Sequence, residues 1–173
     1  MSKKWGCALA VAGWLCTVPA QAVEIQFVAQ DLADVTSGQD LWRYVYRVTG
    51  SFAAGSGFNV LFGPTYGALE DFPTAPNGDW MTSTTPPFAG ADSLYTAIAQ
   101  SDPPSMVDPF VVRFVWLGTG TPGSQPFEVF DDQFNVVAQG QTVRPGTTSV
   151  PEPGSLLLIG GALALLRWPR RPA

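Results

Sequence analysis

Prolines and turn-forming residues interrupt the middle of this 173-residue chain so often that no long helix is expected there. Proline lacks a backbone N–H and clashes with the preceding helical turn, so it ends helices. Short apolar stretches alternate with Gly, Asn, Asp, Ser and Thr, which is typical of short strands joined by turns. The prolines between residues 23 and 144 occupy positions 64, 73, 76, 86, 87, 103, 104, 109, 122 and 126.

Two stretches show the period-two alternation of strands that bury one face. In LWRYVYRVT, one face carries Trp42, Tyr44, Tyr46 and Val48, and the other carries Arg43 and Arg47. In FVVRFVWL, one face carries Phe110, Val112, Phe114 and Trp116, and the other carries Val111, Arg113 and Val115. These are the strongest predicted strands, and both are expected to lie in the middle of a sheet.

Weaker strand patterns occupy most of the remaining chain between residues 23 and 144. They begin at Val23 (VEIQFVA), Gly57 (GFNVLF), Leu94 (LYTAIA), Pro126 (PFEVFD) and Phe134 (FNVVAQGQTV), and Gly78 to Met81 reads as a short edge strand. PFEVFDDQFNVV predicts a hairpin with Asp131, Asp132 and Gln133 at its turn. ADSLYTAIAQ is also compatible with a turn or two of helix capped by Asp92.

Seven or eight short strands with Pro- and Gly-rich loops predict an all-β fold. The expected architecture is an antiparallel β-sandwich, of either the immunoglobulin-like or the jelly-roll type. The pattern does not choose between these two topologies. Flanking elements are a signal peptide before the sandwich and a short hydrophobic helix after it.

The first 22 residues have the features of a secretory signal peptide. Lys3 and Lys4 are followed by an apolar stretch from Trp5 to Val18 and by the sequence Ala20, Gln21, Ala22, which predicts cleavage after Ala22. Both cysteines, Cys7 and Cys16, lie in this segment. The remaining chain is long enough to fold by apolar packing without disulfides.

The region between residues 23 and 149 is strongly acidic. Five of the nine basic residues lie in the terminal segments, which leaves four in this region against 13 of the 14 acidic residues, a net charge of about −9. Such a field repels phosphate backbones, so no nucleic-acid partner is expected.

The sequence contains no histidine, so triads that use histidine as the general base are excluded, as are metal sites built on histidine. Paired carboxyl groups remain, and glycoside hydrolysis requires two of them across a cleft. The neighbouring pairs are Asp31 with Asp34, Glu70 with Asp71, and Asp131 with Asp132. Solvated turn acids are the favoured interpretation, a carboxylate-dependent hydrolase is an alternative, and no cofactor is expected.

Two further binding sites can be predicted from local sequence. DVTSGQD places Asp34, Ser37 and Asp40 in one loop around Gly38, an arrangement of oxygen ligands that calcium accepts, although the rhythm of an EF-hand is absent. Trp80, in the polar stretch NGDWMTS, is the better candidate for a surface aromatic that stacks on a glycan. Trp116 is in register with its strand's apolar face and is expected in the core.

The last 24 residues, VPEPGSLLLIGGALALLRWPRRPA, combine three features in order. The motif Val150, Pro151, Glu152, Pro153 precedes residues 154–166, which carry no charge and as a helix would span about 20 Å, less than the roughly 30 Å of a bilayer core. Arg167, Arg170 and Arg171 follow in the basic tail, residues 167–173. Such charge keeps a C-terminus cytoplasmic, which places the preceding domain outside.

This segment resembles the PEP-CTERM protein-sorting signal of Gram-negative bacteria, also labelled an ice-binding protein C-terminal domain. The resemblance covers residues 150–173 and includes the family's Pro-Glu-Pro at Pro151, Glu152 and Pro153. It implies recognition by an exosortase, a membrane-embedded cysteine transpeptidase, with these three residues as substrate rather than catalyst. The chain shows no regular threonine array, so ice binding is not expected.

The predicted organisation is a signal peptide (1–22), an extracellular sandwich (23–149) and a sorting signal (150–173). The expected function is a non-enzymatic cell-surface or extracellular-matrix protein, with a body that is structural or binds glycans in exopolysaccharide or biofilm. The expected partners are signal peptidase and the general secretion machinery, the membrane in transit, an exosortase and exopolysaccharide. A permanently anchored single-pass envelope protein is the main alternative.

Overall fold

The computed structural model describes residues 23–146, which form nine strands and no helix. The strands are β1 (Glu24–Asp31), β2 (Asp40–Thr49), β3 (Gly57–Phe62), β4 (Tyr66–Leu69), β5 (Trp80–Thr85), β6 (Ser93–Ala99), β7 (Phe110–Trp116), β8 (Pro126–Phe130) and β9 (Val136–Gln141). The predicted signal peptide and the predicted sorting signal lie outside the described residues.

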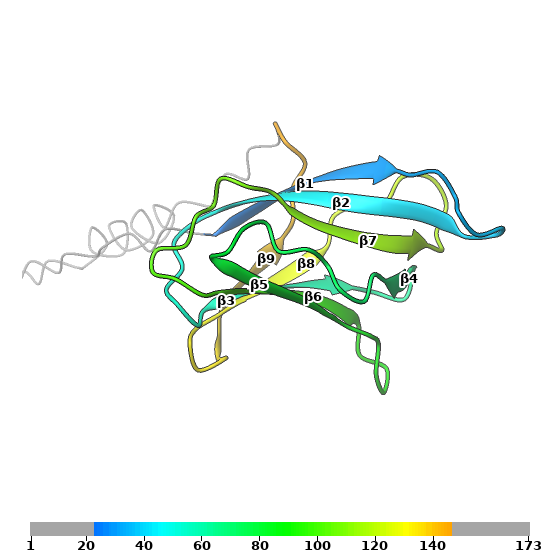
Figure 1. Cartoon of the computed structure of the whole chain (residues 1–173). Helices are drawn as coiled ribbons and strands as arrows, with labels where there is room; N and C mark the ends of the chain where they lie inside the picture. The colour runs from blue at the N-terminus through cyan, green and yellow to red at the C-terminus, as the bar shows by residue number, and fades with distance from the viewer. Residues whose placement is uncertain (1–22, 147–173) are drawn as a thin grey trace, which may run out of the picture.

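The strands form two sheets whose ladders are all antiparallel. The first sheet has the order β1-β2-β7-β4, and the second has the order β5-β6-β3-β8-β9. Figure 1 shows them as two layers, with β1, β2 and β7 above and β3, β5 and β6 below. The prediction of an all-β fold with antiparallel sheets is confirmed.

Most of the strands were predictable from the sequence. All eight predicted strands begin within two residues of the expected positions. The two strong strands, β2 and β7, both lie inside the first sheet, as predicted. The helical alternative for Ala91 to Gln100 is wrong, because β6 pairs with β3 and β5 over this stretch. β4 was not predicted, because four residues between Pro64 and Pro73 carry no readable alternation.

The core between the sheets is built mainly from aromatic rings. The alternating residues of β2 and β7 point inward, as their pattern predicts. Phe110 of the first sheet lies 5.1 Å from Phe58 and 4.9 Å from Trp80 of the second, measured between ring centroids in edge-to-face geometry. Tyr46 and Tyr95 meet across the layers at 6.3 Å. Aromatic burial of this kind supplies the apolar packing that replaces disulfides.

A buried polar cluster around Gln125 lies at one end of this core. The Gln125 side chain, 1 % exposed, accepts hydrogen bonds from Tyr46 Oη and Thr142 Oγ1 at 3.2 Å each, and its Nε2 donates to Tyr66 Oη at 2.9 Å. Nε2 also donates to the Gly123 carbonyl. Because every polar atom of this amide has a partner, the cluster holds the loop before β8 against both sheets.

The donor directions in this cluster follow from the number of protons available. Tyr44 Oη donates to the Gly123 carbonyl at 2.7 Å, and it lies 3.0 Å from Tyr66 Oη. A phenol has one proton to donate, so Tyr66 is the donor to Tyr44. Burial raises the pKa of Tyr44 and of Tyr46, which keeps both phenols protonated.

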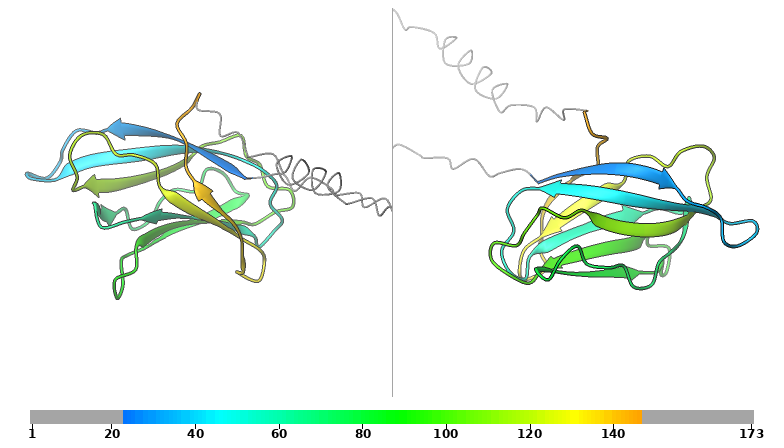
Figure 2. Two further views of the ribbon diagram at one scale, coloured as in Figure 1. Left: turned by 180° about the vertical axis from the view of Figure 1, so that it is seen from behind. Right: turned by 45° about the horizontal axis from the view of Figure 1, so that its top comes forward.

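The segment after β9 passes from the second sheet to the first. Val143 accepts a hydrogen bond from Phe27 N at 2.8 Å and donates to the Ile25 carbonyl at 2.9 Å, which forms a parallel bridge beside β1. Figure 2 shows this segment rising to the layer that contains β1. Since β1 and β4 are the two edges of the first sheet, the last described residues lie at the edge opposite β4.

Candidate ligand groove

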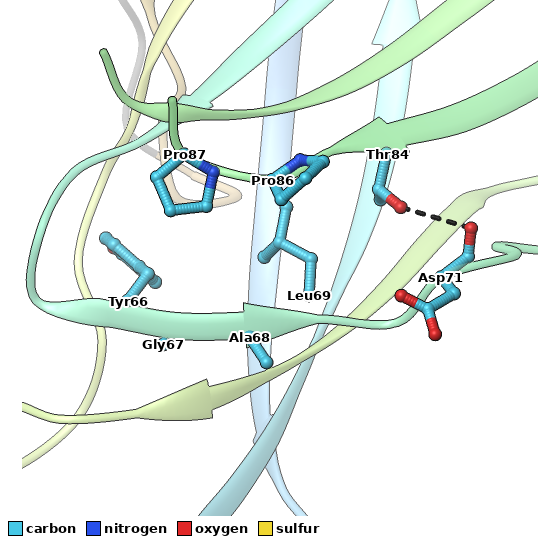
Figure 3. Close-up of a pocket in the computed structure, with 8 residues that line it drawn as sticks. All are labelled: Tyr66, Gly67, Ala68, Leu69, Asp71, Thr84, Pro86 and Pro87. Carbon is cyan, nitrogen blue, oxygen red and sulfur yellow. Dashed lines mark hydrogen bonds between the residues drawn. The ribbon is translucent and has the colours of Figure 1, made fainter. Parts of the chain in front are cut away.

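A groove of about 440 Å³ opens where the edge strands of the two sheets, β4 and β5, approach each other. Figure 3 shows that β4 forms its floor, with Leu69 rising into it and Pro86 and Pro87 above. The complete lining is Tyr66, Gly67, Ala68, Leu69, Asp71, Thr84, Pro86 and Pro87. Prolines cannot donate to a neighbouring strand, so this edge is shaped for contacts by side chains rather than for strand pairing.

Tyr66 is the most firmly positioned residue of the groove. A turn in which Tyr66 N donates to the Gly63 carbonyl at 2.9 Å carries the chain from β3 to β4 and so from one sheet to the other. The Tyr66 ring packs on Phe62, Phe114 and Trp116 with centroid distances between 5.0 and 5.2 Å. With its hydroxyl also bonded in the Gln125 cluster, the Tyr66 ring has a fixed orientation in the groove.

Two threonines of β5 hold the other wall in place. Thr84 Oγ1 donates to the Glu70 carbonyl at 2.7 Å and lies 3.3 Å from the Asp71 carbonyl, and Thr82 Oγ1 donates to the Pro73 carbonyl at 2.8 Å. Figure 3 shows the contact between Thr84 and Asp71. These bonds fasten the segment after β4 to the second sheet.

A second hollow of about 290 Å³ continues from the groove and shares Tyr66 and Pro87 with it. Asp92 also lines this hollow. Phe72 and Phe88 directly follow two residues of the groove lining in the chain, and they are 94 % and 82 % exposed. Exposed aromatic rings next to a groove in the chain are candidates for ligand contacts.

The neighbouring acids Glu70 and Asp71 point to different sides of the segment that carries them. Asp71 lines the groove, whereas Glu70 lies with Arg113 and Leu41 in a shallow hollow on the other side. Burial raises the pKa of Glu70, and Arg113, whose Nε is 3.9 Å from Glu70 Oε2, opposes that rise. The carboxyl groups of Glu70 and Asp71 therefore do not face each other across the groove, as glycoside hydrolysis would require.

The acidic residues of the β8–β9 hairpin lie at its turn, which Asp131 stabilises through hydrogen bonds. Asp131 Oδ1 accepts hydrogen bonds from Asn135 N at 2.8 Å and Gln133 N at 2.9 Å, and these bonds lower the pKa of Asp131. The predicted hairpin is confirmed, with Asp131 N donating to the Asn135 carbonyl at 3.0 Å. Asp132 follows in the same turn. The interpretation of these acids as turn residues agrees with this geometry.

The prediction of Trp80 as a surface aromatic is wrong. Its side chain is 3 % exposed, and its ring lies in edge-to-face contact with Phe52 and Phe110. Its Nε1 donates to the Ser105 carbonyl at 2.9 Å. Buried in this way, Trp80 offers no ring face to a sugar. Trp116, expected in the core, is instead partly exposed and packs on Tyr66 at the end of β7.

The predicted calcium loop forms the exposed turn between β1 and β2. Asp34 Oδ1 accepts a hydrogen bond from Leu41 N at 3.0 Å, and Asp40 Oδ1 accepts one from Trp42 Nε1 at 2.7 Å. Ser37 lies between them, next to Gly38 with its positive φ of 82°. Within residues 23–146, no group of three His, Cys, Asp or Glu side chains is arranged to hold a metal ion. The calcium site stays a prediction.

The described residues thus form a domain of two antiparallel sheets, with the groove at one side between β4 and β5. A comparison with protein-family models, curated proteins and solved structures found no match to this chain. Among residues 23–146, no helix has the length and apolar character needed to cross a membrane. Of the groove residues, sequence reasoning named only Asp71 as a candidate, although the adjacent Pro86, Pro87 and Phe88 in a polar stretch were a visible signal of an exposed aromatic.

Proposed function

We propose that this protein is exported, sorted at the cell envelope through its C-terminal segment by an exosortase, and displayed as a glycan-binding module. The observation that carries the sorting part is the match between domain and motif boundaries. β1 begins at Glu24, two residues after the predicted cleavage at Ala22, and the last strand pairing, the bridge of Val143 to Gln26, precedes the motif at Val150.

The position of the chain ends supports display of the groove. The last described residues lie beside β1, and the groove lies beside β4, at the opposite edge of the first sheet. A domain held through its C-terminal segment would thus direct the groove away from its attachment. Pro151 and Pro153 favour an extended backbone around Glu152, which suits the cleft of a protease or transpeptidase.

The sorting proposal predicts the termini of the mature protein. In the native host, the chain is expected to begin at Val23 and to lack the residues beyond Pro153, as measured by intact mass, peptide mapping and cell fractionation. Glu152→Ala should leave Arg170 and Arg171 attached in the membrane fraction, because the motif is no longer recognised. Glu128→Ala, outside the motif, serves as the control. Recovery of wild-type protein with Arg170 and Arg171 in the membrane would instead establish a permanent anchor.

The groove supports the glycan-binding part of the proposal. Its Tyr66 ring is fixed, the exposed Phe72 and Phe88 directly follow lining residues in the chain, and Asp71 and Thr84 supply oxygen atoms. Aromatic rings that pack on the C–H faces of sugars, together with a few polar atoms, are the usual composition of such sites.

Phe88→Ala and Phe72→Ala are expected to weaken binding of a neutral polysaccharide by about 1 kcal/mol each, roughly fivefold, because each removes one ring contact. Affinity electrophoresis in gels containing soluble xylan or hydroxyethylcellulose measures this change. Phe134→Ala is the matched control, since Phe134 is also exposed but lies in the β8–β9 hairpin. Unretarded migration of the wild-type protein in both gels would refute the neutral-glycan groove, as would an equal effect of all three variants.

We further infer that the sandwich is of the immunoglobulin-like rather than the jelly-roll type. In variable-type immunoglobulin domains, one sheet has the order A-B-E-D and the other has C″-C′-C-F-G. The orders β1-β2-β7-β4 and β5-β6-β3-β8-β9 fill the same positions. The connections differ, because the chain forms the D-position strand β4 directly after β3 and only then adds β5 and β6.

A further inference from the structure

The outer surface of the first sheet gathers most of the positive charge of the described chain. The side chains opposite the core on β2 and β7 include Arg43, Arg47 and Arg113, which are three of the four basic residues within residues 23–146. Aliphatic residues separate them. We call this surface the arginine face; it consists of Gln26, Val28, Gln30, Leu41, Arg43, Val45, Arg47, Val111, Arg113 and Val115.

The strand register arranges the arginine face in rows across three strands. Gln30, Arg43 and Arg113 form one row, because Arg43 is the direct partner of both others. Val28, Val45 and Val111 form the next row, and Gln26 with Arg47 forms a third. Since a strand rises about 3.3 Å per residue, Arg43 and Arg47 are about 13 Å apart along β2.

Arg43 and Arg113 form a like-charge pair directly across the ladder, an arrangement that repels unless an anion lies between the two guanidinium groups. Arg43 Nε donates to Gln30 Oε1, which orients one guanidinium, and the Arg113 side chain is 59 % exposed. Two carboxylates lie at the margins, Glu70 near Arg113 and Glu24, which accepts a bond from Gln26 Nε2 at 2.7 Å.

The charge of the arginine face is opposite to that of its surroundings. Counting the two marginal carboxylates, the face carries a net charge of about +1, while the other described residues contain Arg144 and 11 acids. Arg144 lies elsewhere, over the ring of Phe27 at 5.5 Å from its centroid. Within residues 23–146, this face is therefore the surface at which an anionic polymer meets the least repulsion.

We propose that the arginine face binds an acidic polysaccharide, a chain of sugars that carries repeated carboxylate groups. Guanidinium groups form paired, planar hydrogen bonds with carboxylates, and the chain uses arginine here without any lysine. The row of valines between the arginine rows offers an apolar strip to the C–H faces of the sugar rings. The site is separate from the groove and rests on the proposed function only in requiring that the domain reach an extracellular polymer.

Other occupants fit this face less well. An acidic peptide that adds a strand needs a free sheet edge, but β2 and β7 are both paired on each side. Surfaces that insert into a membrane interface carry large apolar side chains such as Trp, Phe or Leu, whereas the apolar residues between these arginines are mainly valines. A second copy of the domain that docked through this same face would bring two sets of arginines together, which like-charge repulsion opposes.

The test is affinity electrophoresis of the purified protein in gels containing sodium alginate or sodium polygalacturonate. Retardation of the wild type is expected, and it should decrease as salt rises. The triple variant Arg43→Gln, Arg47→Gln, Arg113→Gln should bind at least tenfold more weakly. Arg144→Gln is the control, since it removes the same residue type outside the face. Arg43→Lys with Arg113→Lys should also weaken binding, because the charge remains but the planar fork is lost.

Several results would overturn the proposal. These are unretarded wild-type protein in both acidic gels, equal losses in Arg144→Gln and the triple variant, and retardation that survives in the triple variant. Arginine-dependent binding to phosphatidylglycerol vesicles but not to either polymer would assign the face to a membrane, and arginine-dependent dimers in sedimentation would assign it to a second copy. Phe88→Ala should bind alginate normally, so failure of the neutral-glycan groove and failure of this proposal can be told apart.

Discussion

Replacing Trp80 with alanine is expected to lower the free energy of unfolding by about 3–5 kcal/mol, the cost of removing a large aromatic side chain from a packed core. The ring contacts Phe52, Phe58 and Phe110 with centroid distances of 5.4, 6.1 and 4.9 Å. Its removal leaves a cavity at the edge where β5 meets the core. It also leaves the Ser105 carbonyl without the Trp80 Nε1 donor.

Urea unfolding of the two proteins would measure this loss as a shift of the midpoint at constant slope. Trp80→Phe provides an intermediate, since it keeps a ring in the core but loses the bond to Ser105. Met81→Ala is the control on the same strand, because the Met81 side chain points outward and is about half exposed. A change below about 1 kcal/mol in Trp80→Ala would contradict the burial of this residue and restore it as a surface aromatic.

Gln125→Leu is expected to cost about 3 kcal/mol, although the two side chains are similar in size. Leucine leaves Tyr46 Oη and Thr142 Oγ1 without their acceptor and Tyr66 Oη without its donor. Each unsatisfied buried polar atom carries its own desolvation cost. Because Tyr66 is held partly by this bond, the groove should also lose its fixed ring.

Gln139→Leu is the matched control for this substitution. Gln139 lies on β9 and makes an exposed hydrogen bond to Glu128 at 3.0 Å. Its loss should change the free energy of unfolding by no more than about 0.5 kcal/mol. Equal effects of the two substitutions in urea unfolding would show that the Gln125 cluster contributes no more than a surface bond.

The strands that the sequence predicted most strongly are those whose own residues carry a period of two. β2 and β7 alternate apolar and polar side chains along their length, so each strand indicates its buried face without reference to neighbours. β4 could not be found in this way, because its four residues are defined by irregular pairing with β7 at Tyr66 and Leu69. Pairing of this kind depends on where distant segments meet.

The burial of Trp80 likewise could not be predicted from the residues next to it in the chain. It stands at the start of β5, next to polar residues that are typical of a surface loop. Its direction is decided by its pairing with Ala99 of β6, which turns the indole toward Phe110 of the other sheet. The groove is equally non-local, since Tyr66 and Pro87 are brought together by two edge strands from different sheets.

The amino-acid sequence by itself determined the all-β class and the absence of long helices from the described domain, because proline spacing and side-chain alternation act over a few residues. It also predicted a signal peptide and a sorting signal, both of which lie outside the described residues. Only the tertiary structure decided the order of the strands, the burial of Trp80, the groove beside β4 and the alignment of Arg43 with Arg113. Each of these features depends on contacts between segments distant in the chain, and no local pattern of residues specifies which segments meet.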